Sequence, residues 1–369
     1  MMIVFLMVSL ALFQVIVMGP QQIENGQVIN LFRQKIITQE QLYDQLSEKR
    51  VVLVGETHND PNHHKVQLKI IQGIYKHNNN MAIGLEMIPR HLQSQLDRWV
   101  ADELSREDFL KAVDWDQTWG FDSDLYMPIL RFARDNNIHL VAMNIKREVV
   151  KQVRLKGLDG VADNIKDELP KIAPASDKYK TMLREVFESH PMMSKMGKFE
   201  NFVDAQQVWD GVMATQINHW LGENPYGLLV GLAGSGHISY GNGIPHQLKS
   251  QGVEDIATVL PWNIEEKWAD YKVANYAWGV PKPPPPPVRF GIMLQEVETG
   301  VLITTVFKDS IAEKHGIKAE DEIRELNGET ITTIKRLKWL IKNMEWGDKA
   351  TLTVNRDGDV KKIELELER

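Results

Sequence analysis

Imidazole and carboxylate side chains follow several short apolar runs in this sequence. Two histidines and two glutamates are a plausible set of ligands for a divalent metal of the zinc, iron or manganese kind. The same residues can supply a general base and the partner that orients it. A third interpretation is that they only cap the helices that follow. The four candidate catalytic residues are Glu56, His58, Glu86 and His237.

The segment 51–61 predicts how Glu56 and His58 are positioned. Residues 51–54 are all apolar, which is typical of a buried strand in a parallel sheet. Asp60 followed by Pro61 predicts the start of a helix, with Asp60 as its N-cap. Glu56 and His58 therefore belong to a strand-to-helix turn at the carboxyl end of a strand, where open α/β sheets bind their ligands.

The pattern of apolar runs and helical stretches repeats along the chain. Strands are also expected near 81–86, 138–143, 226–232 and 256–260, and the stretches between them are helical. This order predicts an α/β fold with a parallel-sheet core, flanking helices and a helical insertion at 146–222. Because parallel strands share one direction, their carboxyl ends meet at one edge. The residues expected there are Glu56, His58, Glu86, Asn144 and His237.

The helical insertion contains two further candidate features. The segment 189–196 combines His190 with several methionines and could cover a flat apolar cofactor, although methionines that fill gaps in a mobile connection are the interpretation we favour. The helix expected over 199–221 is amphipathic. Gln206 and Asp210 share one of its faces, which could meet the site or the solvent.

Composition excludes several classes of function. The chain has 369 residues, of which 43% are hydrophobic and 25% charged, with a net charge of −7. With no basic block, a nucleic-acid partner is not expected. The chain contains no cysteine, so disulfides, thiolate nucleophiles, cysteine-ligated metals and an N-terminal lipidated cysteine are excluded.

The first nineteen residues are almost entirely apolar. We interpret 1–19 as a signal peptide or membrane anchor of an exported protein in the periplasm or cell envelope. No lysine or arginine precedes the apolar stretch, and Pro20 follows the small residue Gly19. The alternatives are a misassigned start and a buried helix.

Ordered motifs over residues 28–262 resemble those of the ChaN-like haem-binding family. This family is related to the Tiki and TraB proteins and the erythromycin esterases, a superfamily marked by two Gly-x-x-His motifs and a glutamate between them. The corresponding residues here are Gly55 to His58, Gly234 to His237, and Glu86. The other matching motifs are His64, Gly84–Met87, Trp119–Phe121, Ala142–Asn144, Ala205–Gln206, Trp209–Asp210, Met213–Ala214 and Ala233–Ile238.

The resemblance implies two competing functions. A haem-binding protein of the cell envelope, in which a homodimer encloses the cofactor, needs an apolar slot and one or two axial ligands. A Tiki-like metal-dependent peptidase needs a metal with an open position, for which His58, Glu86 and His237 are suitable ligands, with Glu56 as ligand or base. The candidate haem-binding residues are His58, His64, His190, His237 and Tyr240.

The last part of the chain resembles a PDZ domain over 289–369. An aromatic and proline-rich linker, 263–288, is expected to separate it from the α/β domain at 20–262. The resemblance implies a small β-rich, α+β domain that captures an extended C-terminal peptide by strand addition. A structural or self-associating module is the alternative. The residues implied in holding the peptide carboxylate are Phe290, Gly291, Ile292 and Met293.

These observations favour an exported two-domain protein that binds haem in iron acquisition or haem handling, while its PDZ domain recruits a partner. A metal-dependent peptidase, whose PDZ domain delivers substrate tails, is the alternative. A non-catalytic scaffold with a degenerate site is the third hypothesis.

Overall fold

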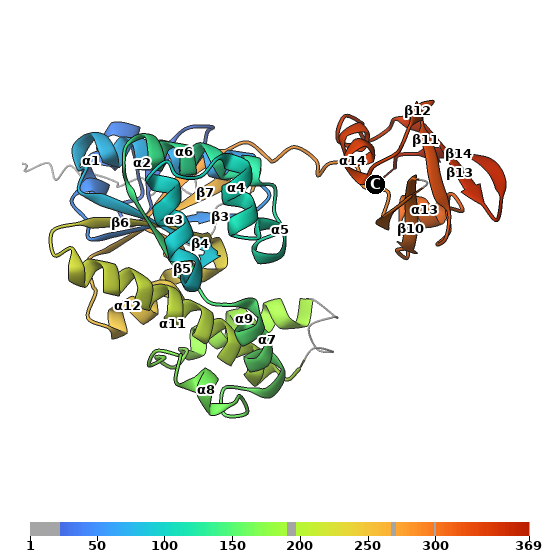
Figure 1. Cartoon of the computed structure of the whole chain (residues 1–369). Coiled ribbons are helices and arrows are strands. Elements are labelled where there is room, and N and C mark those ends of the chain that lie inside the picture. Colours follow the sequence, from blue (N-terminus) through green and yellow to red (C-terminus); the bar gives the residue numbers. More distant parts are fainter. Residues whose placement is uncertain (1–22, 190–196, 267–270, 299, 369) are drawn as a thin grey trace, which may run out of the picture. The chain divides into compact units, whose positions relative to one another are not determined.

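The computed structural model describes residues 23–189, 197–266, 271–298 and 300–368. The chain divides into two compact units, 1–283 and 284–369. The first is α/β and the second is a β-rich PDZ domain (Figure 1). The predicted fold class is confirmed. Within the described residues, no helix is long and apolar enough to cross a membrane.

An eight-stranded sheet forms the centre of the first unit. Adjacent strands run parallel from β8 to the β5 edge, and only β1 and β2 are antiparallel to their neighbours. In order across the sheet the strands are β2 (Lys35–Ile37), β1 (Val28–Asn30), β8 (Tyr276–Val280), β7 (Ile256–Asn263), β3 (Val51–Glu56), β6 (Leu228–Gly234), β4 (Met81–Pro89) and β5 (His139–Asn144).

Helices cover both faces of this sheet, so its central strands are buried on both sides (Figure 1). Val52 and Val54 pack against the layer of α1 (Gln39–Ser47), α2 (Pro61–His77), α3 (Gln93–Val100) and α6 (Met127–Asp135). Val51 and Leu53 pack against α11 (Phe199–Glu223) and α12 (Ile244–Ser250). This alternation explains why the predicted strands are continuous apolar runs.

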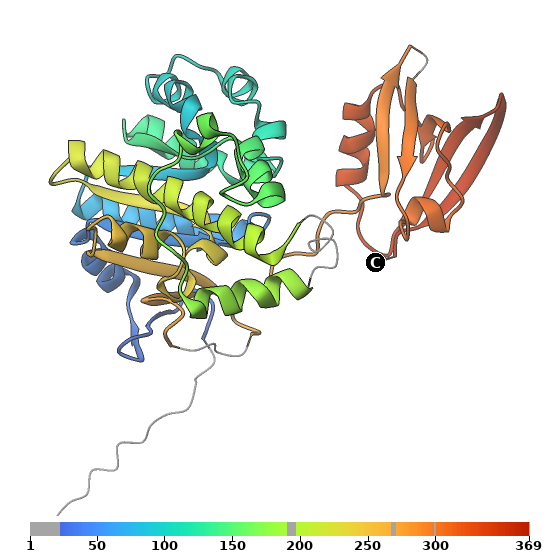
Figure 2. The same ribbon diagram turned by 90° about the horizontal axis from the view of Figure 1, so that it is seen from below.

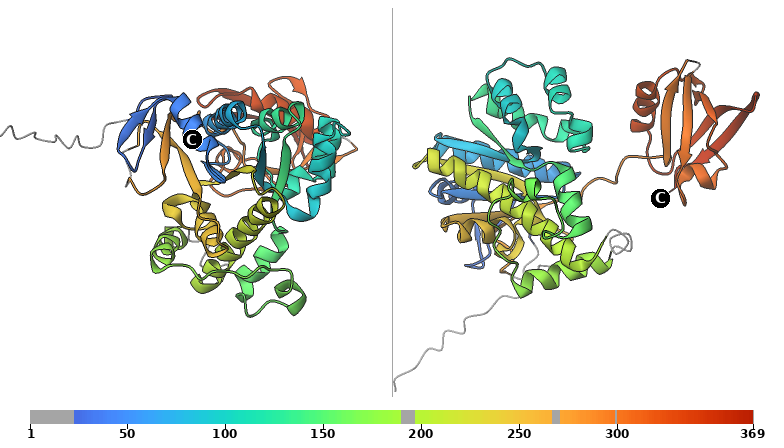
Figure 3. Two further views of the ribbon diagram at one scale, coloured as in Figure 1. Left: turned by 90° about the vertical axis from the view of Figure 1, so that its left-hand side faces the viewer. Right: turned by 60° about the horizontal axis from the view of Figure 1, so that its bottom comes forward.

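The remaining helices flank these two layers. Within the helical insertion, the earlier helices α7 and α9 pack against α11 (Figure 3). The shorter elements are α4 (Arg106–Ala112), α5 (Trp115–Thr118), α7 (Arg147–Lys156), α8 (Asp163–Lys166), α9 (Asp177–Ser189), η1 (Arg90–Leu92), η2 (Ser123–Leu125), η3 (Ser235–His237) and η4 (Ser239–Gly241).

The helix start expected at Asp60 and Pro61 is present, and α1 begins with a capped turn as well. Thr38 forms a reciprocal capping box with Gln41 at α1, and the Asp60 side chain accepts the Asn62 N–H at the start of α2. Pro89 is the last residue of β4, and α3 begins only after η1. Proline lacks an N–H, which a strand end tolerates as well as a helix start does.

Strand β8 extends the sheet with residues from the segment predicted as a linker. Tyr276–Val280 pairs with both β1 and β7, and all five residues are buried. The aromatic part of 263–288 thus packs in the first unit, and the described chain leaves that unit through its prolines.

The PDZ domain is an antiparallel sheet with two helices. Figure 2 shows the longer helix, α14 (Ile334–Lys342), lying alongside the strands. The core contains Phe290, Ile303, Leu337 and Leu352 among other apolar residues. The strands are β14 (Asp359–Glu366), β13 (Lys349–Arg356), β11 (Glu322–Leu326), β10 (Gly300–Val306) and β9 (Ile292–Val297) in sheet order; β12 (Glu329–Thr330) pairs with β11, and α13 is Ile311–Lys314.

Candidate functional site

Strands β3, β6, β4 and β5 are neighbours, so their carboxyl ends lie side by side at one edge of the sheet. Glu56, the last residue of β3, is in register with Gly234, the last residue of β6. Glu86 lies near the end of β4, and His237 follows β6 in η3. The structure therefore brings the four candidate residues Glu56, His58, Glu86 and His237 together.

Glu56 is a buried carboxylate that accepts hydrogen bonds on both oxygens. Oε1 lies 2.8 Å from Nδ1 of His58 and accepts the Tyr126 hydroxyl at 2.9 Å. Oε2 accepts the side-chain amide of Gln67 at 2.8 Å. Burial alone would raise the pKa of Glu56, but the hydrogen bond from His58, the charges of His64 and His58 and the amide outweigh it and lower that pKa.

His58 is held by Glu56 but remains accessible. Its ring packs against Trp119, at 4.7 Å between centroids, and Phe121, at 4.9 Å. The side chain is 30% exposed. Burial opposes protonation of the ring, but the Glu56 hydrogen bond and the charges of Glu86 and Glu56 prevail, so the pKa of His58 is raised. With Nδ1 bound to Glu56, Nε2 is the nitrogen that can meet a ligand.

His237 has an equivalent carboxylate partner from a different element. Its Nδ1 lies 2.6 Å from Oδ1 of Asp210 on α11, and Oδ2 of Asp210 accepts the Tyr179 hydroxyl at 2.9 Å. The ring packs edge-on against Trp209 at 5.2 Å. Burial lowers the pKa of His237, but the negative charges of Asp210 and Glu86 outweigh burial and raise it to about 9.

Glu86 lies between these two histidines and is fully buried. Oε2 accepts the Gly234 N–H at 2.6 Å, while Oε1 has no hydrogen-bond partner in the described part of the chain and lies 3.5 Å from Nε2 of His237. Burial raises the pKa of Glu86, and the charges of His237 and His58 counteract this only in part. An unpartnered buried oxygen indicates that this point of the site can receive a ligand.

The centre therefore consists of two similar triads on either side of Glu86. Each triad is a tyrosine that donates to a carboxylate, which in turn holds Nδ1 of a histidine: Tyr126, Glu56 and His58 in one, and Tyr179, Asp210 and His237 in the other. A carboxylate that holds one imidazole nitrogen fixes the ring and its tautomer. This arrangement suits an oriented base or an oriented ligand.

Gly234 is needed where the two triads approach each other. A Cβ on this residue would lie 3.0 Å from Cε1 of His58 and 3.6 Å from Cδ2 of His237. Any side chain would therefore crowd the His58 ring, whereas the His237 contact is an ordinary one. This close approach gives the second Gly-x-x-His motif a steric explanation.

The other candidate residues at the sheet edge have supporting positions. His64 is buried, with Nε2 3.1 Å from the His58 carbonyl oxygen and Nδ1 3.1 Å from Oε1 of Gln67. The amide of Asn144 donates to the Glu86 carbonyl oxygen at 2.6 Å. These hydrogen bonds hold the backbone at the ends of β3 and β4 in place. His190 lies outside the described residues.

A ready-made metal centre is not found. Across residues 23–189, 197–266, 271–298 and 300–368, no three His, Asp or Glu side chains are grouped so that they could hold an ion. The metal hypothesis for His58, Glu86 and His237 thus has no structural support.

Tyr240 follows His237 by three residues and borders a hollow of about 420 Å³. Its backbone is left-handed (φ 60°, ψ 16°), its N–H donates to the Val273 carbonyl at 2.7 Å, and the Lys178 ammonium lies 4.6 Å from the ring centre. Aromatic, cationic and small polar side chains share the lining with one acidic side chain, that of Glu254. They include Phe32, Tyr240, Lys249, Thr258, Tyr271 and Lys272.

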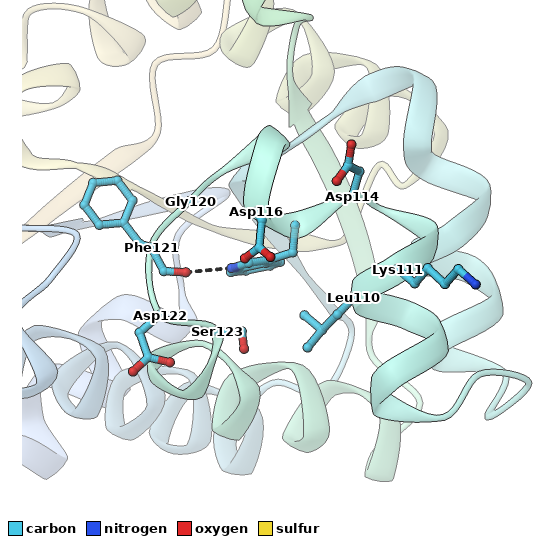
Figure 4. Close-up of a pocket in the computed structure, with 9 residues that line it drawn as sticks. Leu110, Lys111, Asp114, Asp116, Gly120, Phe121, Asp122 and Ser123 are labelled. Atoms are coloured by element: carbon cyan, nitrogen blue, oxygen red, sulfur yellow. Dashed lines mark hydrogen bonds between the residues drawn. The ribbon is translucent and has the colours of Figure 1, made fainter. Parts of the chain in front are cut away.

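A second hollow, of about 410 Å³, is lined by residues 110–123 (Figure 4). Phe121 belongs both to this hollow and to the ring cluster around His58, and its carbonyl accepts the Trp115 indole N–H at 2.7 Å. Asp114, Asp116 and Asp122 line it with a single lysine, Lys111. This hollow is mainly acidic, in contrast to the one at Tyr240.

Sequence reasoning missed several residues of the triads. Tyr126 immediately precedes α6, and Tyr179 lies in the first turn of α9. Neither follows a strand end, which was the signal that identified the other residues of the site. Gln67 lies on the inner face of α2 among apolar residues, where a buried polar side chain was a detectable signal. The sequence identified Asp210 as a residue that could face either the site or the solvent. In the structure it faces the site.

The residues implied in PDZ peptide binding surround the start of β9. Phe290 is buried in the core, and Gly291 has a left-handed backbone (φ 75°). Ile292 is half-buried, whereas Met293 is 54% exposed.

Comparison with known proteins supports both domains. The family described as haem-binding uptake, Tiki superfamily, ChaN matches residues 42–248, and the PDZ domain family matches residues 288–367. A solved structure described as cofacial heme binding to ChaN of Campylobacter jejuni has a TM-score of 0.57 and 21% identity, covering 70% of this chain and 98% of that chain. At this identity the likeness shows the fold.

Two curated relatives match parts of the chain. Protein RETICULATA-RELATED 5, chloroplastic, of Arabidopsis thaliana is 22% identical over 261 residues, which are 64% of this chain and 35% of that protein. Periplasmic serine endoprotease DegP of Escherichia coli strain K12 is 36% identical over 77 residues, which are 21% of this chain and 16% of DegP. The chain thus spans about a third or less of these relatives.

Proposed function

Because the chain belongs to the ChaN family of haem-binding uptake proteins in the Tiki superfamily, we propose that it binds haem at Tyr240 and handles it at the cell envelope. Its PDZ domain recruits a protein partner to that task. Haem is cargo in this proposal, held by a phenolate or phenol oxygen on the iron.

The hollow beside Tyr240 is the observation that carries this proposal. A haem is a flat apolar macrocycle with two carboxylates. The hollow has aromatic side chains for the macrocycle and lysines for the carboxylates. Phe32 is 81% exposed and Tyr271 43% exposed at its border, so both can lie against the macrocycle. Lys249 and Lys272 supply positive charge for the propionates. The donor set therefore fits haem.

The backbone of Tyr240 supports a ligand role. A left-handed conformation is unusual for a tyrosine and is held here by the hydrogen bond to Val273. The Lys178 ammonium, 4.6 Å from the ring centre, packs against the ring and helps to hold this side chain in place. The fixed turn thus holds a residue with a hard oxygen donor in the lining of the hollow.

A haemin titration of the full chain, followed in the Soret region, tests the proposal. The wild type is expected to saturate at a fixed stoichiometry, and Tyr240→Phe is expected to change the bound spectrum and weaken binding. Tyr226→Phe is the matched control, because Tyr226 is 87% exposed and does not line the hollow. A non-saturating response of the wild type, or an identical spectrum of the Tyr240→Phe variant, would contradict it.

Dimerisation and export belong to the same proposal. The exposed Phe32 and Tyr271 leave apolar surface that a second copy can cover once haem is bound. The apolar segment 1–19, which lies outside the described residues, supports export and attachment to the envelope. Sedimentation with and without haemin tests the dimer, and fractionation of cells tests the location.

A second candidate function is hydrolysis at the sheet edge. It is favoured by the unpartnered Oε1 of Glu86 beside two carboxylate-held histidines. In this arrangement His58 accepts a proton from water, and protonated His237 stabilises the developing oxyanion. Peptide hydrolysis by the full chain, assayed with and without a chelator, tests it. Activity that survives both His58→Ala and His237→Ala would exclude the site.

A further inference from the structure

The PDZ domain has an open sheet edge beside a helix. In the part of this domain that the structure describes, β9 is the last strand of the sheet and pairs only with β10. The helix α14 packs beside β9 (Figure 2), and Oε1 of Glu296 accepts the Ile334 N–H at 2.9 Å. Unpaired N–H and C=O groups at such an edge are a template for one more strand.

The hydrogen bond from Ile334 to Glu296 fixes the relative direction of the two elements. It joins the first residue of α14 to a residue near the end of β9. The start of β9, at Ile292, therefore corresponds to the last turn of α14, at Ile341. A peptide that ends beside Gly291 places its last side chain near Ile341 and its preceding residues toward Ile334.

Apolar side chains are available on both elements. Ile292 and Leu294 alternate along β9, are half-buried and pack against the core. Ile334 and Ile341 are the corresponding half-buried residues on α14. An extended peptide presents every second side chain to this surface, so its last residue is expected to be apolar.

Lys338 interrupts the apolar stripe of α14. It follows Ile334 by four residues and precedes Ile341 by three, so all three share one face of the helix. The side chain is exposed and has no acidic partner among the described residues. Arg336, in contrast, is already paired with Glu329 at 2.8 Å. Lys338 is therefore a cation on the face beside the open edge.

Helix and strand spacings place a peptide side chain opposite Lys338. Lys338 lies about 4.5 Å along the helix axis from Ile341, and Ile334 lies about 10.5 Å from it, at 1.5 Å per residue. The third-last residue of an extended peptide lies about 6.6 Å from the last, at 3.3 Å per residue. That side chain is thus nearer to Lys338 than to Ile334.

We infer that the PDZ domain binds protein C-termini that end in an apolar residue and carry aspartate or glutamate at the third-last position, paired with Lys338. The inference rests on the proposed peptide recruitment by this domain. It names the chemistry of the partner: an acidic, apolar-ended tail.

Fluorescence anisotropy of the full-length protein with labelled peptides tests the inference. Three peptides end in valine and differ only at the third-last residue, which is glutamate, glutamine or lysine. At low salt, the wild type is expected to bind the glutamate peptide about threefold more tightly than the glutamine peptide and about tenfold more tightly than the lysine peptide. Lys338→Glu is expected to reverse this order.

Lys335→Glu is the matched control variant. It makes the same charge change on the same helix, one position beyond Ile334 and about 100° away from the stripe. It is expected to keep the preference for glutamate. Binding of all three peptides with equal affinity, or the same change of preference in both variants, would overturn the inference alone. No binding of any peptide by the wild type would overturn peptide recruitment as well.

Discussion

Nδ1 of His237 lies 2.6 Å from Oδ1 of Asp210, although the two residues are 27 positions apart and belong to different elements. Asp210 is fully buried within α11, and Tyr179 holds its second oxygen. This contact ties the helical layer to the end of β6. It also makes the protonated form of the His237 imidazole the favoured one, which has measurable consequences.

The first prediction concerns stability between pH 6.5 and 9. The pKa of His237 is raised from 6.5 to about 9, so folding favours its protonated form. That contribution is complete below pH 6.5 and disappears as the pH rises through 9. Its size is roughly 3 kcal/mol, from about 1.4 kcal/mol per pKa unit. Urea unfolding followed by tryptophan fluorescence is expected to reveal this decline in the wild type.

Asp210→Asn isolates the contribution of this pair. Asparagine can still accept the Tyr179 hydroxyl but carries no charge to retain the His237 proton. The variant is expected to be less stable at pH 6.5 and to have a flatter profile up to pH 9. Because the pKa of His58 is also raised, some dependence of the free energy of unfolding on pH remains in this variant. A profile as steep as that of the wild type would contradict the assignment.

The second prediction concerns acid stability and Glu56. The pKa of Glu56 is lowered, so its contribution is present above pH 4.5 and is lost as the pH falls through its folded value. Glu56→Gln is expected to reduce stability at pH 7 by roughly 3 kcal/mol, because a buried pair loses one partner. The difference in free energy of unfolding between the wild type and Glu56→Gln should become smaller below pH 4.

An exposed carboxylate provides the comparison for Glu56. Glu40 pairs with His77 at 3.0 Å, but its side chain is 73% exposed. Glu40→Gln is therefore expected to change the free energy of unfolding little, because exposed ion pairs contribute little. An equal loss of unfolding free energy in Glu56→Gln and Glu40→Gln would argue against a special role of the hydrogen bonds around Glu56.

The main strands and the meeting of their polar ends were predictable from the sequence. Continuous apolar runs such as 51–54 identify strands covered on both faces, and Asp60 with Pro61 marks the helix start that follows. Strand direction then brings Glu56, Glu86 and His237 to one edge without knowledge of strand order. This part of the site depends only on local pattern and on the geometry of parallel sheets.

The remaining parts depend on contacts between distant segments. Strands β1 and β2 contain only three residues each, too few for a periodic signal. Tyr126 and Tyr179 reach the site through helix packing, which the spacing of residues does not encode. The aromatic segment around Trp278 resembles a linker in composition, yet its pairing with β1 and β7 buries it.

The third prediction tests the charges at the Tyr240 hollow. Lys249→Glu places a negative charge beside the proposed propionate position and is expected to weaken haemin binding by about tenfold at low salt. The dimethyl ester of haemin lacks the propionate charges and should bind the wild type and this variant equally. Lys65→Glu, at an exposed position on α2 that does not line the hollow, is the control. Equal weakening with both porphyrins would exclude a propionate contact.

The fourth prediction concerns the steric role of Gly234. In Gly234→Ala, the new methyl group would lie 3.0 Å from Cε1 of His58, so this ring has to move by a few tenths of an ångström. Its position is constrained by Glu56 and by Trp119. The expected result is a folded protein that loses about 1 kcal/mol of stability and has shifted imidazole signals of His58 and His237 in NMR spectra.

The same motif provides the matched control for this steric prediction. Gly236 lies two residues further along, and a Cβ there would meet no atom within 4 Å; its φ is outside the left-handed region. Gly236→Ala should therefore leave both imidazole signals and the stability unchanged. If the two alanine variants shift the signals equally, the close approach of Gly234 to His58 is not what requires a glycine. A shift confined to Gly234→Ala would link the second Gly-x-x-His motif to the position of the histidine in the first.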